Sequence, residues 1–160
     1  MTVAVITISD RAARGEYEDL SGPEVERAVR DRYPTAAVSR SVVPDEPAAI
    51  LAALEARAGA DFILTTGGTG LSARDVTPEV TRRFCEREIP GIAEVIRAQS
   101  YAETPAAMLS RGTAGLRGST IVVNFPGSPR AVRLCMKVLG PVMEHALRMV
   151  RGEGHQAAFS

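Results

Sequence analysis

A short apolar run followed by a glycine-rich turn constrains this chain more than any other feature. Residues 62–64 are Phe-Ile-Leu, residues 65–70 read Thr-Thr-Gly-Gly-Thr-Gly, and Thr77 and Pro78 follow. A continuous apolar run is typical of a strand buried on both faces. A hydroxyl residue before proline is typical of a helix start. The pattern predicts a strand, a glycine loop and a helix, the unit in which α/β proteins bind ligands beyond their strand ends.

The same alternation recurs along the chain. Apolar runs at residues 3–8, 38–43 and 121–125 also predict strands, and apolar residues at helical spacing follow each run. Residues 21–24, Ser-Gly-Pro-Glu, have the form of a capping box before a helix. The apolar stripe over residues 132–150 predicts one long final helix.

Strands that alternate with helices predict an α/β fold with a mostly parallel sheet covered by helices on both faces. The 160 residues, 17.0 kDa in mass, suffice for one domain with a substantial core. We therefore expect a single three-layer domain over residues 1–152 and a flexible C-terminal tail over residues 153–160.

Composition excludes several classes of partner. Nineteen acidic residues balance nineteen basic residues, and this balance gives no indication of nucleic-acid binding. No apolar run approaches the ~20 residues that span a bilayer, and the first apolar run starts too early for a signal peptide. We expect a cytoplasmic protein that binds neither nucleic acid nor membrane.

The cysteines and histidines do not suggest a metal or nucleophile site. Cys85 and Cys135 are 50 residues apart and have no neighbouring metal-ligand motif, so we expect core thiols. His145 lies in the predicted final helix and His155 in the predicted tail. The cysteines and histidines are therefore too few and too scattered to suggest a zinc site or a histidine-based triad.

Four loops are expected to share one edge of the sheet. They cover residues 9–10, 44–46, 66–75 and 126–129, and each follows a predicted strand. Parallel strands end at the same edge, where ligands of such sheets bind. The glycine loop matches neither the dinucleotide fingerprint nor the lysine-containing phosphate loop. It predicts either a tight turn or an anion site built from backbone N–H groups and threonine hydroxyls.

Two aspartates near this loop have two interpretations each. Asp45 precedes a proline-opened helix and Asp75 precedes Thr77, so either carboxylate can serve as a structural cap. Brought together beside a phosphate, the two would suit Mg²⁺, which prefers carboxylate and phosphate oxygens. Ser110, Arg111 and Arg117 are either phosphate contacts or ordinary surface residues.

Several motifs in order resemble one known family. They are Ser-Asp-Arg at residues 9–11, Val-Pro-Asp-Glu at 43–46, the glycine loop, Arg-Asp-Val-Thr-Pro-Glu at 74–79, Met-Leu-Ser-Arg at 108–111 and Asn-Phe-Pro-Gly-Ser-Pro at 124–129. This order over about residues 3–152 resembles the Mog/MoaB family of molybdenum-cofactor biosynthesis, which includes the G domain of gephyrin. Members are α/β proteins, typically homotrimers, that bind molybdopterin.

The resemblance implies an adenylyltransferase. Mog-type members use Mg-ATP to adenylylate the terminal phosphate of molybdopterin, and the product passes to a molybdate-insertion protein. Asp45 and Asp75 would hold Mg²⁺ and act in catalysis. The implied substrate-binding residues are Ser9, Asp10, Thr66, Gly67, Gly68, Thr69, Gly70, Ser100, Ser110, Pro126 and Gly127.

Two other functions stay open. Some MoaB-type members bind molybdopterin without adenylyl transfer, although the intact motifs around Asp45 and Asp75 place this chain nearer the active branch. Competence-damage proteins share this domain and suggest a nucleotide pyrophosphatase, but the extra domain that they carry is absent from this sequence.

Overall fold

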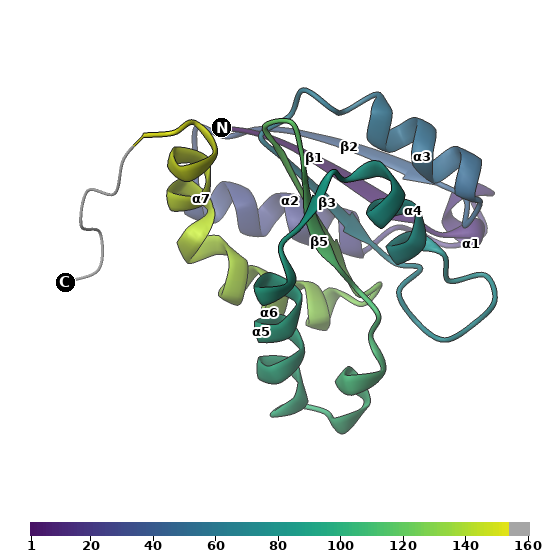
Figure 1. Ribbon diagram of the computed structural model, residues 1–160. Helices are drawn as coiled ribbons and strands as arrows, with labels where there is room; N and C mark the ends of the chain where they lie inside the picture. The colour runs from purple at the N-terminus through teal and green to yellow at the C-terminus, as the bar shows by residue number, and fades with distance from the viewer. Residues whose placement is uncertain (154–160) are drawn as a thin grey trace.

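A six-stranded mixed sheet forms the centre of the molecule (Figure 1). The computed structural model describes residues 1–153. Within the sheet the order is β2-β1-β3-β6-β5-β4; β2, β1, β3 and β6 are parallel, and β5 and β4 are antiparallel to their neighbours. The strand bounds are β1 (Thr2–Ile8), β2 (Ala37–Val43), β3 (Phe62–Thr66), β4 (Arg87–Glu88), β5 (Ala114–Arg117) and β6 (Thr120–Phe125). The predicted mostly parallel sheet is confirmed.

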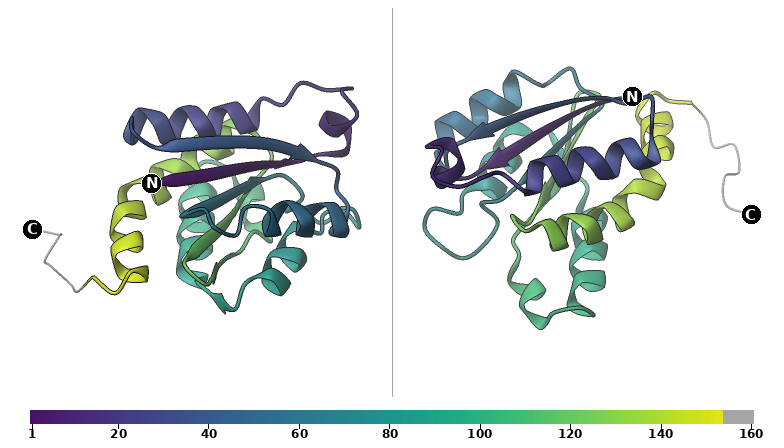
Figure 2. Two further views of the ribbon diagram at one scale, coloured as in Figure 1. Left: turned by 90° about the horizontal axis from the view of Figure 1, so that it is seen from above. Right: turned by 180° about the vertical axis from the view of Figure 1, so that it is seen from behind.

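Helices cover both faces of this sheet, as predicted (Figures 1 and 2). One face carries α3 (Pro47–Glu55) and α4 (Thr77–Phe84). The other carries α2 (Ser21–Arg32), α5 (Pro90–Tyr101), α6 (Pro129–Leu139) and α7 (Met143–Val150). The remaining elements are the short α1 (Asp10–Ala13) and two 3₁₀ helices, η1 (Pro105–Leu109) and η2 (Gly140–Val142).

The central strands β1, β3 and β6 supply apolar side chains to two separate cores. In β1, Val3 and Val5 pack against the α2 and α6 side, whereas Ala4, Ile6 and Ile8 pack against α3 and α4. This alternation follows from the two-residue repeat of a strand. It explains why the central strands carry nearly continuous apolar runs.

Two helix starts differ from their predictions. Ser21 is the first residue of α2 and does not cap it; the backbone N–H of Gly22 donates to Asp19 Oδ1 at 2.9 Å instead. Thr77 likewise lies inside α4, and its hydroxyl donates to the carbonyl oxygen of Gly67. In both places, a hydrogen bond to a loop residue takes the place of the helix-cap hydrogen bond that the local sequence predicted.

The predicted long final helix is divided in the structure. α6 ends at Leu139, the 3₁₀ helix η2 contains Pro141, and α7 begins at Met143. Proline lacks the backbone N–H that continues a helix, so the chain tightens and turns there. The apolar stripe nevertheless continues, because Val132, Leu139 and Leu147 all belong to the same core.

The strand β5, and with it the β5–β6 hairpin, was not predicted from the sequence. Gly118 in its turn has a φ of +55°, a conformation that glycine adopts readily.

No helix among residues 1–153 is both long and apolar enough to cross a bilayer. Apart from Glu153, the predicted tail and His155 lie outside the described residues.

Candidate functional site

The four predicted loops lie along one edge of the sheet. The parallel register pairs Ile8 with Val43 and pairs Thr66 with both Thr7 and Phe125, so β1, β2, β3 and β6 end side by side. Figure 1 shows this edge near α1, with the glycine loop projecting beyond it. The shared edge predicted from the sequence is confirmed.

Glycine is required at two positions of the loop. Gly67 has a φ of +100°, and a Cβ there would lie 2.2 Å from the carbonyl oxygen of Ile8. Gly68 has a φ of +64°, and its Cβ would lie 2.2 Å from Thr77 Oγ1. Both positions combine a left-handed backbone with contacts too close for a side chain. The loop therefore presents bare backbone between β1 and α4.

Hydrogen bonds from neighbouring elements fix this loop. The backbone N–H of Gly67 donates to the carbonyl oxygen of Phe125 at 3.1 Å, and the backbone N–H of Thr77 donates to that of Gly68 at 3.1 Å. The buried Thr66 hydroxyl donates to the carbonyl oxygen of Pro126 at 2.9 Å. The loop is preorganised by β6 and by the first turn of α4.

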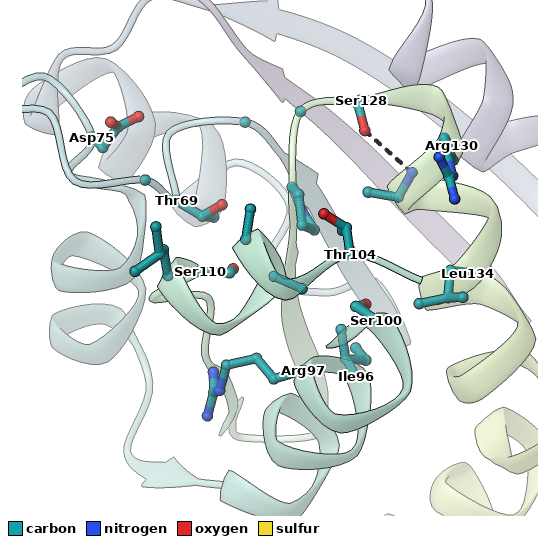
Figure 3. Close-up of a pocket in the computed structure, with 18 of the residues that line it drawn as sticks. Thr69, Asp75, Ile96, Arg97, Ser100, Thr104, Ser110, Ser128, Arg130 and Leu134 are labelled. Carbon is teal, nitrogen blue, oxygen red and sulfur yellow. Dashed lines mark hydrogen bonds between the residues drawn. The ribbon is translucent and has the colours of Figure 1, made fainter. Parts of the chain in front are cut away.

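A cavity of about 690 Å³ opens beside the glycine loop (Figure 3). Its walls are the loop, α5, η1 and the start of α6. It contains many of the residues implied by the family resemblance: Gly67, Gly68, Thr69, Gly70, Asp75, Ser100, Ser110, Pro126 and Gly127. Residues far apart in the chain, from Gly67 to Leu134, thus share one cavity of the size that small-molecule sites have.

One hydroxyl in this cavity lacks a partner. Ser100 Oγ is the only buried side-chain nitrogen or oxygen among residues 1–153 that has no hydrogen bond within the protein. Ser100 lies in the wall formed by α5, with Ile96 and Thr104 near it in the view of Figure 3. Buried polar groups are nearly always paired, so an unpaired hydroxyl on a residue that lines a cavity is a candidate ligand contact.

The remaining implied residues lie outside this cavity. Ser9 and Thr66 line a smaller cavity of about 180 Å³, which also contains Tyr17 and Asp19. Gly67 and Gly127 line both cavities, so the two cavities adjoin at these glycines. Asp10 and Asp45 line neither cavity.

Asp10 and Asp45 instead join two strand-end loops. The backbone N–H of Asp10 donates to Asp45 Oδ2 at 2.8 Å, and the backbone N–H of Asp45 donates to Asp10 Oδ1 at 3.0 Å. The cap of α3 is Glu46, so the interpretation of Asp45 as a helix cap is wrong. Arg74 reaches across from the glycine-loop side and forms an ion pair with Asp10.

The two aspartates differ in their electrostatics. Burial raises the pKa of Asp45, and the negative charges of Asp10 and Asp75 act in the same direction. The hydrogen bond from Arg74 lowers the pKa of Asp10. Arg74 therefore acts as a local counter-ion within a predominantly acidic group of side chains.

The donor set fits Mg²⁺ that is shared with a phosphate ligand. Asp45 Oδ1 would lie 3.3 Å from a Cβ on Gly68, and Asp75 Oδ2 would lie 3.0 Å from a Cβ on Gly70, so both carboxylates border the loop. Within residues 1–153, no three acidic, histidine or cysteine side chains form a metal-binding group. Magnesium is commonly held by one or two carboxylates together with substrate phosphates and water, which suits this arrangement.

Two arginines have roles that the sequence did not reveal. Arg111 is partly buried and donates to backbone carbonyl oxygens of the glycine loop and Asp75. Arg117 lies over the Phe84 ring, away from the cavity. The wall formed by Thr104 and η1 was also missed as part of the site, because its proximity to the glycine loop depends on tertiary packing.

Comparison with known proteins identifies the family. The family described as a probable molybdopterin binding domain matches residues 4–145. This chain belongs to that family. A relative in Helicobacter pylori (strain J99), named molybdopterin adenylyltransferase, is 34% identical over 158 residues, covering 94% of this chain and 88% of the relative.

Solved structures of the family have the same fold. The structure of MogA superposes with a TM-score of 0.87 at 38% identity and covers 94% of this chain and 99% of its own. The molybdopterin biosynthesis enzyme MoaB from Thermus thermophilus gives a TM-score of 0.84 at 42% identity, covering 97% of this chain and 99% of its own. The predicted family and fold class are confirmed.

Proposed function

We propose that this protein is a molybdopterin adenylyltransferase, which transfers AMP from Mg-ATP to the terminal phosphate of molybdopterin. The observation that carries the proposal is the juxtaposition of a preorganised glycine loop with Asp45 and Asp75 at one sheet edge. Family members that carry this name support the same activity.

The large cavity suits the pterin substrate. Apolar side chains such as Ile96 and Leu134 offer surfaces for the ring system, while Ser100 and Ser110 offer hydroxyls. The glycine loop offers Gly68 and Thr69 as the cradle for the terminal phosphate, because backbone N–H groups suit an anion. Ser9, Asp10, Thr66, Pro126 and Gly127 would complete the binding edge.

The reaction requires no protein nucleophile. An oxygen of the molybdopterin phosphate attacks the α-phosphorus of ATP, a new P–O–P bond forms, and pyrophosphate leaves with the electron pair of the broken bond. Asp45 and Asp75 would hold Mg²⁺, which when bound neutralises negative charge on the triphosphate. The residues of the chain then contribute orientation, because aligned reactants lose less entropy at the barrier.

The proposal extends to the cellular context. We infer that the protein works in the cytoplasm as a homotrimer and delivers its adenylylated product to a molybdate-insertion protein. The family resemblance supports this inference. Sedimentation velocity at micromolar concentration tests the assembly, and a stable monomer would contradict it.

A coupled assay tests the activity. Incubation of the protein with molybdopterin and Mg-ATP should yield adenylyl-molybdopterin and pyrophosphate. The variants Asp45→Asn and Asp75→Asn should bind molybdopterin but lower kcat by at least about a hundredfold, since the substituted amides are poor magnesium ligands. Asp31→Asn is the matched control, because Asp31 on α2 is 68% exposed and lies away from the site.

Two results would favour the alternatives. Tight pterin binding without any ATP-dependent product indicates a non-catalytic molybdopterin-binding protein. Hydrolysis of free nucleotide without pterin indicates a pyrophosphatase. Normal turnover by both site variants would overturn the residue assignment.

A further inference from the structure

We infer that Arg111 is the positioning residue of the site, and that its guanidinium holds Asp75 at the distance from the glycine loop that adenylyl transfer requires. The inference rests on the proposed function and adds a residue to it. Arg111 does not line the large cavity, although its neighbour Ser110 does. It acts on the reaction through the backbone that carries Asp75.

The guanidinium of Arg111 has three acceptors. Its Nε donates to the carbonyl oxygen of Gly70 at 2.7 Å, and its Nη2 donates to the carbonyl oxygen of Asp75. Its Nη1 forms an ion pair with Glu79 on α4. The side chain is only 34% exposed. A planar guanidinium can serve three such acceptors at once, because its donors point in fixed directions.

These contacts hold both ends of an exposed loop segment, at Gly70 and at Asp75. The residues between Gly70 and Asp75, numbered 71–74, are exposed. Ser72 bonds back to Asp75: its backbone N–H donates to Asp75 Oδ2 at 2.9 Å. The carbonyl of Asp75 and its carboxylate are thus fixed by different donors. Among the described residues, the hydrogen bond to this carboxylate comes from Ser72, which itself lies in the exposed segment. Without Arg111, nothing outside that segment would fix the position of Asp75.

The backbone of Arg111 makes a separate contact. Its N–H donates to the carbonyl oxygen of Thr69 at 2.9 Å, and this hydrogen bond survives any substitution of the side chain. Thr77 holds the first half of the loop through Gly67 and Gly68. Loss of the guanidinium should therefore release the segment from Gly70 to Asp75 while the phosphate cradle stays in place.

This division predicts a split between kinetic constants. Arg111→Met should lower kcat by about a hundredfold, the effect of misplacing a reacting group by about 1 Å. The KM for molybdopterin should stay within about threefold, because the cradle is retained. Arg111→Lys should stay at least about tenfold below wild type in kcat, since an ammonium cannot serve both carbonyl oxygens and Glu79 in the same geometry.

Two further variants separate positioning from a surface ion pair. Glu79→Gln retains an acceptor and removes only the charge, so kcat should change by less than about threefold if the carbonyl contacts dominate. Arg117→Met is the matched control. Arg117 also donates to a backbone carbonyl oxygen, that of Phe84, and faces Glu86, but it lies away from the cavity. Its loss should leave both kinetic constants unchanged.

Amide hydrogen exchange tests the inference without the reaction. The hydrogen-bonded backbone amides of Ser72 and Asp75 should exchange at least about tenfold faster in Arg111→Met and Arg111→Lys than in the wild type, with no change in Arg117→Met. If the wild type forms no adenylyl-molybdopterin, the proposed function fails, and faster exchange still establishes the clamp on Asp75. Unchanged exchange, unchanged kcat in Arg111→Met, or an equal loss in Arg117→Met would overturn the inference.

Discussion

The side-chain amide of Asn124 donates a 2.9 Å hydrogen bond to the hydroxyl of Thr81, and so joins β6 to α4 through the interior. The same amide donates to Thr65 on β3 at 2.9 Å, and its oxygen accepts from the backbone N–H of Thr113. All four residues are buried. One side chain thus connects β3, which precedes the glycine loop, with α4, which follows it.

Replacement of this amide should be costly. Asn124→Leu keeps the number and branching of the side-chain heavy atoms but leaves two buried hydroxyls and one backbone N–H without their partner, so we expect a loss of about 2–4 kcal/mol in unfolding free energy. Urea denaturation measures it. Gln99→Leu, at an exposed position on α5, should change stability by less than about 0.5 kcal/mol. Equal effects of the two would show that the network does not stabilise the fold.

Loss of the Ser100 hydroxyl should weaken ligand binding without lowering stability. Ser100→Ala removes a buried hydroxyl that has no protein partner, so stability should stay the same or rise slightly. The KM for molybdopterin should rise about five- to tenfold, the value of one neutral hydrogen bond. Ser128→Ala is the contrast, because Ser128 caps α6 through the backbone N–H of Ala131, and its loss should cost about 1 kcal/mol. A destabilised Ser100→Ala variant would contradict the ligand role.

Two glycines with positive φ should differ in their tolerance of alanine. Gly67→Ala places a Cβ 2.2 Å from the carbonyl oxygen of Ile8 and should cost about 4 kcal/mol or more. Gly118→Ala meets no atom within 4 Å and should cost only the ~1–2 kcal/mol of a left-handed backbone. Chemical denaturation of both variants measures the difference. Equal losses would mean that the close approach to Ile8 is relieved by a small shift of β1.

The thiols should be unreactive in the folded protein. Burial raises the pKa of Cys85 to about 11 and that of Cys135 to about 12. The thiolate is the reactive form, so folding suppresses it at about pH 8. The alkylation rate of folded protein should rise about tenfold per pH unit between about pH 7 and 9.5. In the unfolded chain it should level off above the ordinary cysteine pKa of about 8.5. A plateau near that ordinary pKa in the folded state would contradict the burial effect.

The sequence predicted the parts of the fold that depend on local patterns. The apolar runs at residues 3–8 and 62–64 indicated the strands, and the parallel arrangement then placed their loops at one edge. The hydrogen-bond partners of polar side chains were predicted less well. Ser21 and Thr77 resembled caps, whereas the carboxylate of Asp19 accepts the backbone N–H of Gly22 in the first turn of α2 and Thr77 bonds to the glycine loop. Several acceptors compete for each hydroxyl, and the tertiary structure decides among them.

The site was predicted as a set of residues, but not as a geometry. Many of these residues share the large cavity, whereas Ser9 and Thr66 line the smaller one and Asp45 bonds to Asp10. Arg111 was missed as a positioning residue because its acceptors are carbonyl oxygens 36 and 41 residues earlier. Backbone acceptors leave no mark on the local sequence, so only the fold could reveal them.

The shortness of β4 limits how this protein can aggregate. β4 ends the sheet with two residues, Arg87 and Glu88, both charged and exposed. An unpaired sheet edge invites strands from other chains, and short charged edges discourage such pairing. At this end, adding a foreign strand would offer few backbone hydrogen bonds and place charged side chains at the junction. The two-residue β4 thus terminates the sheet at this edge against intermolecular growth.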